Sequence, residues 1–259
     1  MTGNLPESMT TREQQLQYLE AMGIQAWTAR HADDAAEQGA VTSDPAPAPV
    51  AAPDTSAPAV PVSAVFDATD VAGLDWPVLE ARVSECTLCD LHSSRTRTVF
   101  GVGNHNADWL VIGEAPGHDE DQQGEPFVGR AGQLLNAMLQ AVGLQREQVF
   151  IANILKCRPP NNRDPKPEEV ACCEPYLLRQ IELIQPRLIL AVGRIAAQNL
   201  LNTQTPIGKL RGEVHQFRDT GIPLIATYHP AYLLRSPMEK RKSWQDLQLA
   251  LRTLREQSK

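Results

Sequence analysis

The stretch Trp109-Leu-Val-Ile-Gly113 is a run of large apolar residues that ends in a glycine. A short apolar run bounded by turn residues is typical of a strand that is buried on both faces of a sheet. Three more such runs follow along the chain, at residues 149–155, 188–193 and 223–228. Between and after them, apolar residues recur at helical spacing over residues 134–142, 167–184, 195–201 and 244–254. This alternation of strands and helices predicts an α/β fold with a parallel sheet.

The chain of 259 residues divides by composition into three parts. Between residues 35 and 65, alanine, proline, serine, threonine and aspartate dominate. This mixture is too poor in large apolar groups to offset the entropy of ordering. We therefore predict a short helical appendage over residues 1–34, a disordered linker over residues 35–74 and a globular domain over residues 75–259.

Charge is distributed unevenly along the chain, whose formal net charge is −7. Residues 1–70 hold ten acidic and two basic side chains, which leaves 21 acidic and 22 basic ones in the rest. A nearly neutral body can still carry a local basic face, so its charge permits binding to nucleic acid without requiring it. No apolar run is long enough to span a membrane, and the N-terminus lacks a secretory signal pattern. We therefore expect a cytoplasmic protein with no membrane contact.

The cysteines suggest a metal centre. Disulfides are not expected in a cytoplasmic chain, and the spacing of Cys86 and Cys89 lets two thiolates bind one centre. Cys157 follows a predicted strand, Cys173 lies on the next predicted helix, and a proline-rich loop between them can bring the two together. Four thiolates suit either a tetrahedral zinc ion or a four-iron cluster, and spacing alone does not choose. Cys172 points about 100° away from its neighbour on a helix, so we expect it to be a small buried apolar residue.

Three segments resemble the family 4 uracil-DNA glycosylases, and the likeness extends from about residue 85 to the C-terminus. They read GEAPG from Gly113 with GEPFVG from Gly124, then NILKCRPPNNR from Asn153, and HPAYLLR from His229. The resemblance implies a three-layer α/β/α sandwich with a central, mostly parallel sheet. It also implies a monomeric DNA-repair enzyme whose catalytic domain, residues 75–259, flips uracil out of DNA and hydrolyses its bond to the sugar. The same likeness favours iron over zinc, as a [4Fe–4S] cluster held by Cys86, Cys89, Cys157 and Cys173.

The resemblance further implies a set of residues that hold uracil, namely Gly113, Glu114, Ala115, Phe127, Asn153 and His229. Three of them have chemistry that suits the task. Phe127 can stack on a base that has been rotated out of the duplex. The Asn153 amide offers a donor and an acceptor to the uracil edge, and His229 can donate to the negative charge that collects on the departing base. Phe127 lies on a loop, whereas Asn153 and His229 lie near the carboxyl ends of predicted strands, where ligand sites of parallel sheets form.

Two acidic residues have roles that the sequence leaves open. In the GEAPG segment, Ala115 stands where another uracil glycosylase family carries a water-activating aspartate. Gly117 stands where that family carries a tyrosine that blocks the methyl group of thymine. We expect Glu114 to be catalytic, by positioning water or by stabilising the developing sugar cation. We expect Glu120 to form the wall that excludes thymine.

Loops that combine cations with apolar tips are typical of surfaces that hold phosphates and wedge a base step. On this ground the residues expected to contact DNA are Arg163, Lys209, Arg211, Leu233, Leu234 and Arg235. The alternative is that each charge is only part of a solvated loop. The sequence does not indicate a preference for single- or double-stranded DNA.

Two other classes of protein remain open from the sequence. A non-catalytic nucleic-acid-binding module would use the four-cysteine centre but would not need the pocket residues. A redox enzyme would use Cys86 and Cys89 as exposed, reactive thiols. The segment QLQYL from Gln15 loosely resembles the peptides by which bacterial repair proteins dock on the sliding clamp, so a replication or repair protein is a candidate partner.

Overall fold

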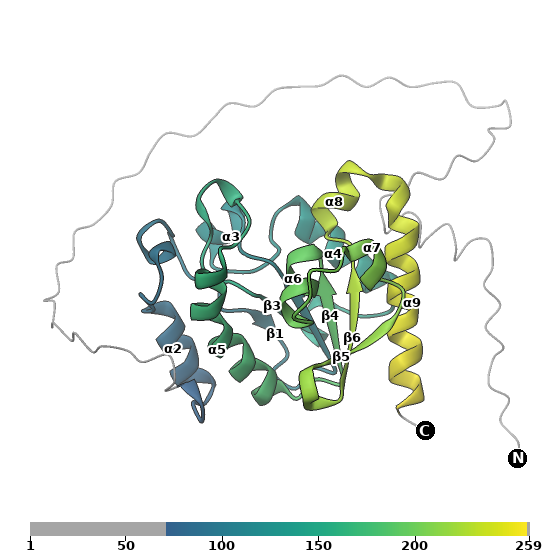
Figure 1. The fold of residues 1–259 in the computed structure, drawn as a ribbon, viewed down its shortest axis with the longest axis horizontal. Coiled ribbons are helices and arrows are strands. Elements are labelled where there is room, and N and C mark those ends of the chain that lie inside the picture. Colours follow the sequence, from purple (N-terminus) through teal and green to yellow (C-terminus); the bar gives the residue numbers. More distant parts are fainter. Residues whose placement is uncertain (1–70, 258–259) are drawn as a thin grey trace, which may run out of the picture. The chain divides into compact units, whose positions relative to one another are not determined.

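The computed structural model describes residues 71–257 of the chain, and a six-stranded sheet forms their centre (Figure 1). The strand order is β1-β3-β2-β4-β6-β5. The strands are β1 Val102–Gly103, β2 Trp109–Gly113, β3 Phe150–Asn153, β4 Leu188–Val192, β5 Val214–Phe217 and β6 Ile222–Thr227. The four inner strands pair in parallel, whereas the edge strands β1 and β5 run antiparallel to their neighbours. The predicted mostly parallel sheet is confirmed.

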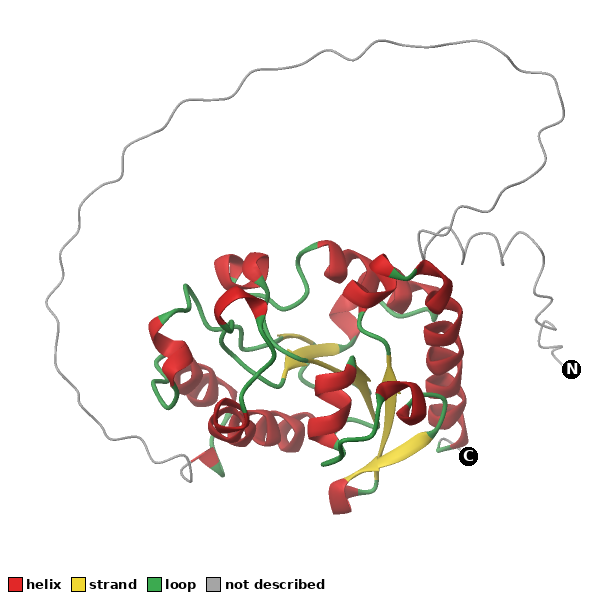
Figure 2. Ribbon diagram, turned by 45° about the horizontal axis from the view of Figure 1, so that its top comes forward, coloured by secondary structure: helices red, strands yellow, loops and turns green. Residues whose placement is uncertain are grey.

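Helices cover both faces of this sheet, as Figure 2 shows, and this confirms the three-layer α/β/α sandwich. The helices are α2 Trp76–Ser84, α3 His118–Gln123, α4 Arg130–Ala141, α5 Pro167–Ile184, α6 Arg194–Leu200, α7 Ile207–Leu210, α8 Pro230–Arg235 and α9 Lys240–Glu256. Because side chains alternate across a strand, Leu110 and Ile112 of β2 pack with α5 and α6, while Trp109 and Val111 pack with α4 and α9. Two apolar cores therefore lie on opposite faces of the sheet.

The four predicted strands correspond to β2, β3, β4 and β6, with one difference that matters for the site. Strand β3 ends at Asn153, although the apolar run in the sequence continues through Leu155. Beyond Asn153 the chain pairs with the loop after β2, because the N–H groups of Ile154 and Leu155 donate to the carbonyls of Gly113 and Glu114 at 3.0 Å. These bonds hold the ends of β2 and β3 together.

The body of the domain begins no later than Val71. This residue is buried in a small core with Leu79, Val83 and Tyr176, and Arg179 donates to the Leu74 carbonyl at 2.7 Å. Residues 71–74 thus belong to the compact domain, although the sequence pattern places them in the linker over residues 35–74. The division over residues 1–70 lies outside the described residues and stays a prediction. No helix among residues 71–257 is long and apolar enough to cross a membrane.

Candidate active site

An open cleft of about 930 Å³ lies at the carboxyl ends of the four inner strands. Each of these strands contributes to its wall, through Glu114 after β2, Asn153 of β3, Gly193 after β4 and His229 after β6. Of the six residues expected to hold uracil, five line this cleft, namely Glu114, Ala115, Phe127, Asn153 and His229. The structure therefore brings together the set that the sequence predicts.

Gly113, the sixth member of that set, lies directly behind the cleft. A Cβ atom at this position would stand 2.4 Å from Oδ1 of Asn153 and 2.6 Å from Cζ of Phe127. Only glycine lets these two side chains approach the strand so closely. Asn153 is 2% exposed, and its Oδ1 accepts no hydrogen bond from the described residues. A buried polar atom without a partner is costly, and it suggests a ligand that supplies the missing donor.

Phe127 occupies a left-handed backbone conformation, with φ of 55°, which is uncommon for a residue with a side chain. Its carbonyl lies against the start of α4, where a Cβ on Gly132 would stand 1.8 Å from the carbonyl oxygen. The Phe127 ring is 5.6 Å from the His229 ring, centroid to centroid, at an interplanar angle of 30°. The aromatic ring and the imidazole therefore lie together in the cleft.

His229 caps the N-terminus of α8 and is half-buried. The backbone N–H of Ala231 donates to its Nδ1 at 3.1 Å, so Nδ1 is an acceptor and the proton of the neutral ring sits on Nε2. Burial lowers the pKa of His229 to about 4, and the nearby Arg235 cation acts in the same direction, while Glu120 opposes it. At neutral pH this residue is an uncharged imidazole that donates through Nε2.

Glu114 and Glu120, two of the acidic residues that line the cleft, have different environments. Burial raises the pKa of Glu114 to about 7, the carboxylate of Asp164 adds to this shift, and Arg194 opposes it. Glu120 instead accepts backbone hydrogen bonds from Gly117 at 3.1 Å, Val128 at 3.0 Å and Gly129 at 3.3 Å. These bonds connect the loop after β2 with the loop between α3 and α4, which carries Phe127. This structural role differs from the thymine wall expected from the sequence.

The four cysteines expected to bind metal lie in one region of the domain. Cys157 and Cys173 are buried and pack with Cys89 around Leu91 and Leu155, and Cys86 is close enough to raise the pKa of Cys89. Burial is the main cause that raises the pKa of Cys89 to about 11 and that of Cys173 to about 12. No three His, Cys, Asp or Glu side chains within residues 71–257 are arranged to hold a metal ion. The four clustered thiols nevertheless provide the soft donors that an iron–sulfur centre requires.

Arg95 joins two of these cysteines, a contact that the sequence analysis does not predict. Its Nη1 donates to Sγ of Cys157 at 3.1 Å and to the carbonyl of Cys86 at 2.7 Å. A guanidinium beside a sulfur favours the thiolate form that binds metal. Cys172 is only half-buried, rather than fully buried as expected, and its thiol donates to the carbonyl of Leu88 at 3.3 Å.

Lys156 lies between the cleft and the cysteine region, and its role is also missed from the sequence. Its ammonium group is fully buried, where it donates to the carbonyl of Asn153 at 3.1 Å and to Oε1 of Gln180 at 2.7 Å. Burial lowers the pKa of Lys156 to about 7. The contact fixes the backbone that carries the Asn153 amide.

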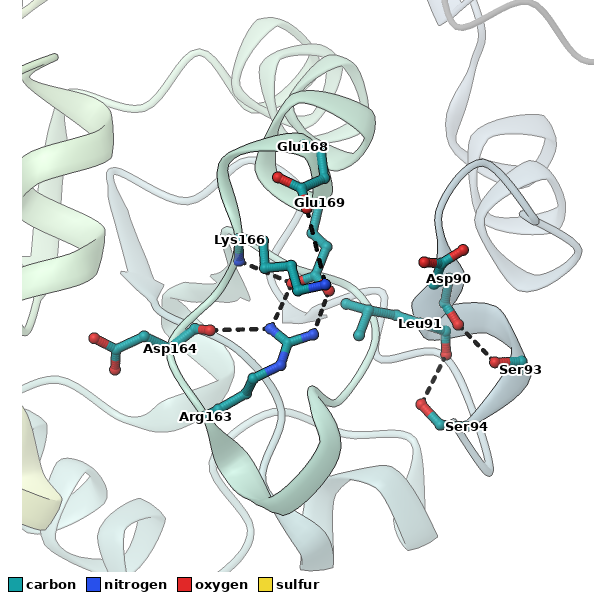
Figure 3. A network of polar contacts seen from close by, with 9 residues as sticks. All are labelled: Asp90, Leu91, Ser93, Ser94, Arg163, Asp164, Lys166, Glu168 and Glu169. Atoms are coloured by element: carbon teal, nitrogen blue, oxygen red, sulfur yellow. Dashed lines mark hydrogen bonds and ion pairs between the residues drawn. The ribbon is translucent and has the colours of Figure 1, made fainter.

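Three of the residues expected to contact DNA have structural partners instead. Figure 3 shows the Arg163 guanidinium in a two-pronged pair with Glu169, at 2.9 and 2.5 Å. Arg211 makes a similar pair with fully buried Asp246, at 3.1 and 2.8 Å. Leu233 is 1% exposed and belongs to the core between the sheet and α9, so it cannot wedge a base step without unfolding. The expectation of DNA contact is wrong for Leu233. It stays a prediction for the two arginines, of which Arg163 also lines the cleft.

The other three expected DNA contacts are exposed. Lys209 lies on the surface of α7, and Leu234 and Arg235 lie at the end of α8. Tyr232, on the same short helix, is 37% exposed and lines the cleft. Arg235 also lines the cleft, whereas Lys209 and Leu234 are exposed on α7 and α8.

The fold and the cleft define a class of enzyme. A sheet-edge cleft with an aromatic ring, an unpaired amide oxygen and a neutral imidazole donor suits a flat heterocyclic base, such as one rotated out of a nucleic acid. Residues 100–248 match the model of the Uracil DNA glycosylase superfamily, and the chain belongs to this family.

Relatives of high sequence identity indicate the activity of this chain within the superfamily. The chain is 52% identical over 161 residues to the Type-4 uracil-DNA glycosylase of Archaeoglobus fulgidus, which covers 60% of this chain and 81% of the relative. It is 46% identical over 160 residues to that of Thermotoga maritima, covering 61% and 83%. It is 42% identical over 180 residues to that of Pyrobaculum aerophilum, covering 67% and 92%. The protein is a uracil-DNA glycosylase, a DNA-repair hydrolase whose substrate is uracil-containing DNA, and not a non-catalytic binding module.

Proposed function

We propose that uracil, flipped out of DNA, enters the cleft at the sheet edge and stacks on Phe127. The observation that carries this proposal is the unpaired Oδ1 of Asn153, a buried side chain in the wall of the cleft. Uracil supplies the missing donor through its N3–H, while the amide nitrogen of Asn153 donates to O4. Cytosine has no N3–H in its neutral form, so it would leave the oxygen unpaired. An unpaired buried group of this kind costs roughly 1–3 kcal/mol, which favours uracil.

His229 stabilises the departing base in this proposal. Negative charge collects on uracil O2 and N1 as the bond to the sugar breaks, and a fixed donor aimed at that charge accelerates the reaction. The neutral ring, with Nδ1 held by Ala231, offers Nε2–H as this donor. Since the pKa of the imidazole is about 4, it acts by hydrogen bonding rather than by delivering a proton.

Glu114 completes the chemistry on the sugar side. Its carboxylate either orients the attacking water or stabilises the positive charge that develops on the sugar, and both tasks need the ionised form. A pKa of about 7 leaves roughly half of the molecules in this form at neutral pH. Ala115 has no group that can activate water. In the loop between β2 and α3, Glu114 is the ionisable residue, and it lines the cleft.

We further propose that Cys86, Cys89, Cys157 and Cys173 hold a [4Fe–4S] cluster. When bound, it would cross-link the segment after α2, the loop after β3 and α5 itself, and so stabilise the frame of the cleft. Arg95 supports this arrangement because it contacts Cys157 and Cys86 together. A thiol titration of the protein as purified separates this arrangement from the redox enzyme, which would need Cys86 and Cys89 as exposed, reactive thiols.

Metal analysis of anaerobically purified protein tests the cluster. We expect about four irons per chain and a broad visible absorbance. Cys173→Ala should lose the iron, whereas Cys172→Ala, its neighbour on α5, should keep it. Stoichiometric zinc without iron in the unmodified protein would refute the cluster.

We also propose that exposed Lys209 and Arg235 bind phosphates at the mouth of the cleft, and that Leu234 wedges the base step. The protein acts as a monomer in the cytoplasm, where free thiols persist and DNA is accessible. The sequence from Gln15 is a candidate docking peptide for a replication or repair protein.

An oligonucleotide with a single uracil tests the activity of the cleft. Incubation followed by alkali should break the strand at uracil, and a matched strand with thymine should remain intact. Equal cleavage of both strands would contradict the proposed recognition.

A further inference from the structure

We propose that Arg146 is a positioning residue for excision, which holds the backbone of Pro126 and Phe127 so that the aromatic ring stays in the cleft. The inference rests on the proposed stacking of uracil on Phe127. Arg146 does not line the cleft, and neither its sequence context nor the family segments single it out.

The contacts of Arg146 converge on one short segment of backbone. Its Nη2 donates to the carbonyl of Pro126 at 2.5 Å, and its Nη1 donates to the carbonyl of Phe127 at 3.4 Å. Nη1 also donates to Oδ1 of Asn136 on α4 at 3.2 Å, which fixes the guanidinium itself. Arginine is suited to this task because its planar fork can satisfy two carbonyls in a fixed geometry.

Phe127 needs such support because of its backbone. Its positive φ is a conformation that persists only where surrounding contacts hold it. Gly132 packs against the Phe127 carbonyl from α4, and Glu120 accepts hydrogen bonds from the next two residues. Arg146 supplies the donor for the two carbonyls on the other side of the loop.

The surroundings of Arg146 argue against a direct contact with DNA. Its side chain is half-buried, and desolvation lowers its pKa. The charges that oppose this shift come from Glu125, Glu147 and Glu120. Three carboxylates near one guanidinium repel a phosphate, so the cation is used within the protein.

The position of Arg146 in the chain connects two parts of the site. It begins the short 3-10 helix η3, Arg146–Gln148, which leads directly into β3 and thus to Asn153. The same segment therefore carries Asn153 at the end of β3 and, through Arg146, holds the backbone of Phe127. A movement of the Phe127 loop is resisted by the segment that carries Asn153.

A double-mutant cycle tests whether Arg146 acts through Phe127. Single-turnover uracil excision is measured at saturating enzyme for the unmodified protein, Arg146→Gln, Phe127→Ala and the double variant. Arg146→Gln should slow excision by roughly 5- to 100-fold, the span of base–aromatic stacking. The double variant should be no slower than Phe127→Ala, because the ring that Arg146 positions is already gone. Arg146→Lys should recover part of the rate, and Arg252→Gln, a matched change of an exposed arginine on α9, should leave it unchanged.

Three outcomes overturn the inference. They are an unchanged rate for Arg146→Gln, losses that multiply in the double variant, or weaker DNA binding with a flatter salt dependence, which would make Arg146 a phosphate contact. If Arg146→Gln does not fold, Arg146→Lys decides the question through the same cycle. A normal rate for Phe127→Ala would instead refute the proposed stacking, so the two failures are distinguishable.

Discussion

We expect the Asn153 amide to add little stability to the free protein and to serve the binding of uracil. Its buried Oδ1 has no partner among the described residues, so Asn153→Ala removes an unsatisfied polar atom. We expect the free energy of unfolding to change by less than about 1 kcal/mol, since this relief offsets the small cavity. Uracil excision should nevertheless fall at least tenfold. Denaturant unfolding and single-turnover assays measure the two effects, and a large loss of stability would show that the amide has a structural partner.

Glu114 predicts a specific pH dependence. Its pKa is raised to about 7, and the proposed role needs the carboxylate, so excision should rise with pH between about 6 and 8. His229 stays neutral throughout this range because its pKa is about 4. Single-turnover rates of Glu114→Gln should be low and independent of pH in the same window. If the rate of Glu114→Gln still rose with pH, the titrating group would be a residue other than Glu114.

The sequence predicts Asn153 and His229 because each carries its own chemistry at the end of a strand. It predicts Phe127 because this residue lies on a loop within a family segment rather than on a periodic apolar face. It does not predict Arg146 or Arg95, whose partners are carbonyl and sulfur atoms 19 and 62 residues away. Contacts of this kind depend on how loops fold back, and no periodicity or spacing reports them. Glu120 shows the same limit, since its three backbone donors appear only in the folded loops.

At the scale of elements, the inner strands are predictable and the edge strands are not. Burial on both faces makes β2 and β4 continuous apolar runs, which stand out in a sequence. β1 has only two residues, and β5 reads Val-His-Gln-Phe with one fully buried side chain. Neither has the pattern of a buried strand. The end of β3 is also hidden, because buried loop residues continue its apolar run.

The connection between α7 and β5 carries a prediction about stability. Arg211 pairs with Asp246 of α9, which also accepts a hydrogen bond from Thr227 at 2.9 Å. Arg211→Ala leaves a buried carboxylate without its cation, so we expect a loss of about 3–5 kcal/mol in the free energy of unfolding.

Lys209 is the matched control for this change, because it is exposed on α7 beside Arg211. Lys209→Ala should keep its stability but weaken DNA binding, with the salt slope reduced by about 0.9. Thermal unfolding and binding at several salt concentrations separate the two residues. A stable Arg211→Ala protein with a reduced salt slope would restore Arg211 as a DNA contact.

For the whole molecule, the residues of the cleft all lie within the matched part of the chain, residues 100–248. Residues 1–70, which carry an excess of negative charge, lie outside it. We expect removal of this whole segment to leave excision from a short oligonucleotide intact. Their charge would even repel DNA weakly, so affinity at low salt should not fall. Excision and solubility of the shortened protein are the measurements. A collapse of either would show that this segment is part of the catalytic body.

The central claim is that the cleft breaks the bond to uracil and that His229 stabilises the departing base. The most direct measurement compares single-turnover excision by the unmodified protein and His229→Ala at saturating enzyme, with DNA affinity determined in parallel. Loss of one fixed donor should slow excision by about 10²–10³-fold. Affinity and its salt slope should stay nearly unchanged, because a neutral imidazole adds no charge to the phosphate contacts. An unchanged rate with weakened binding would make His229 a DNA-contact residue and contradict this mechanism.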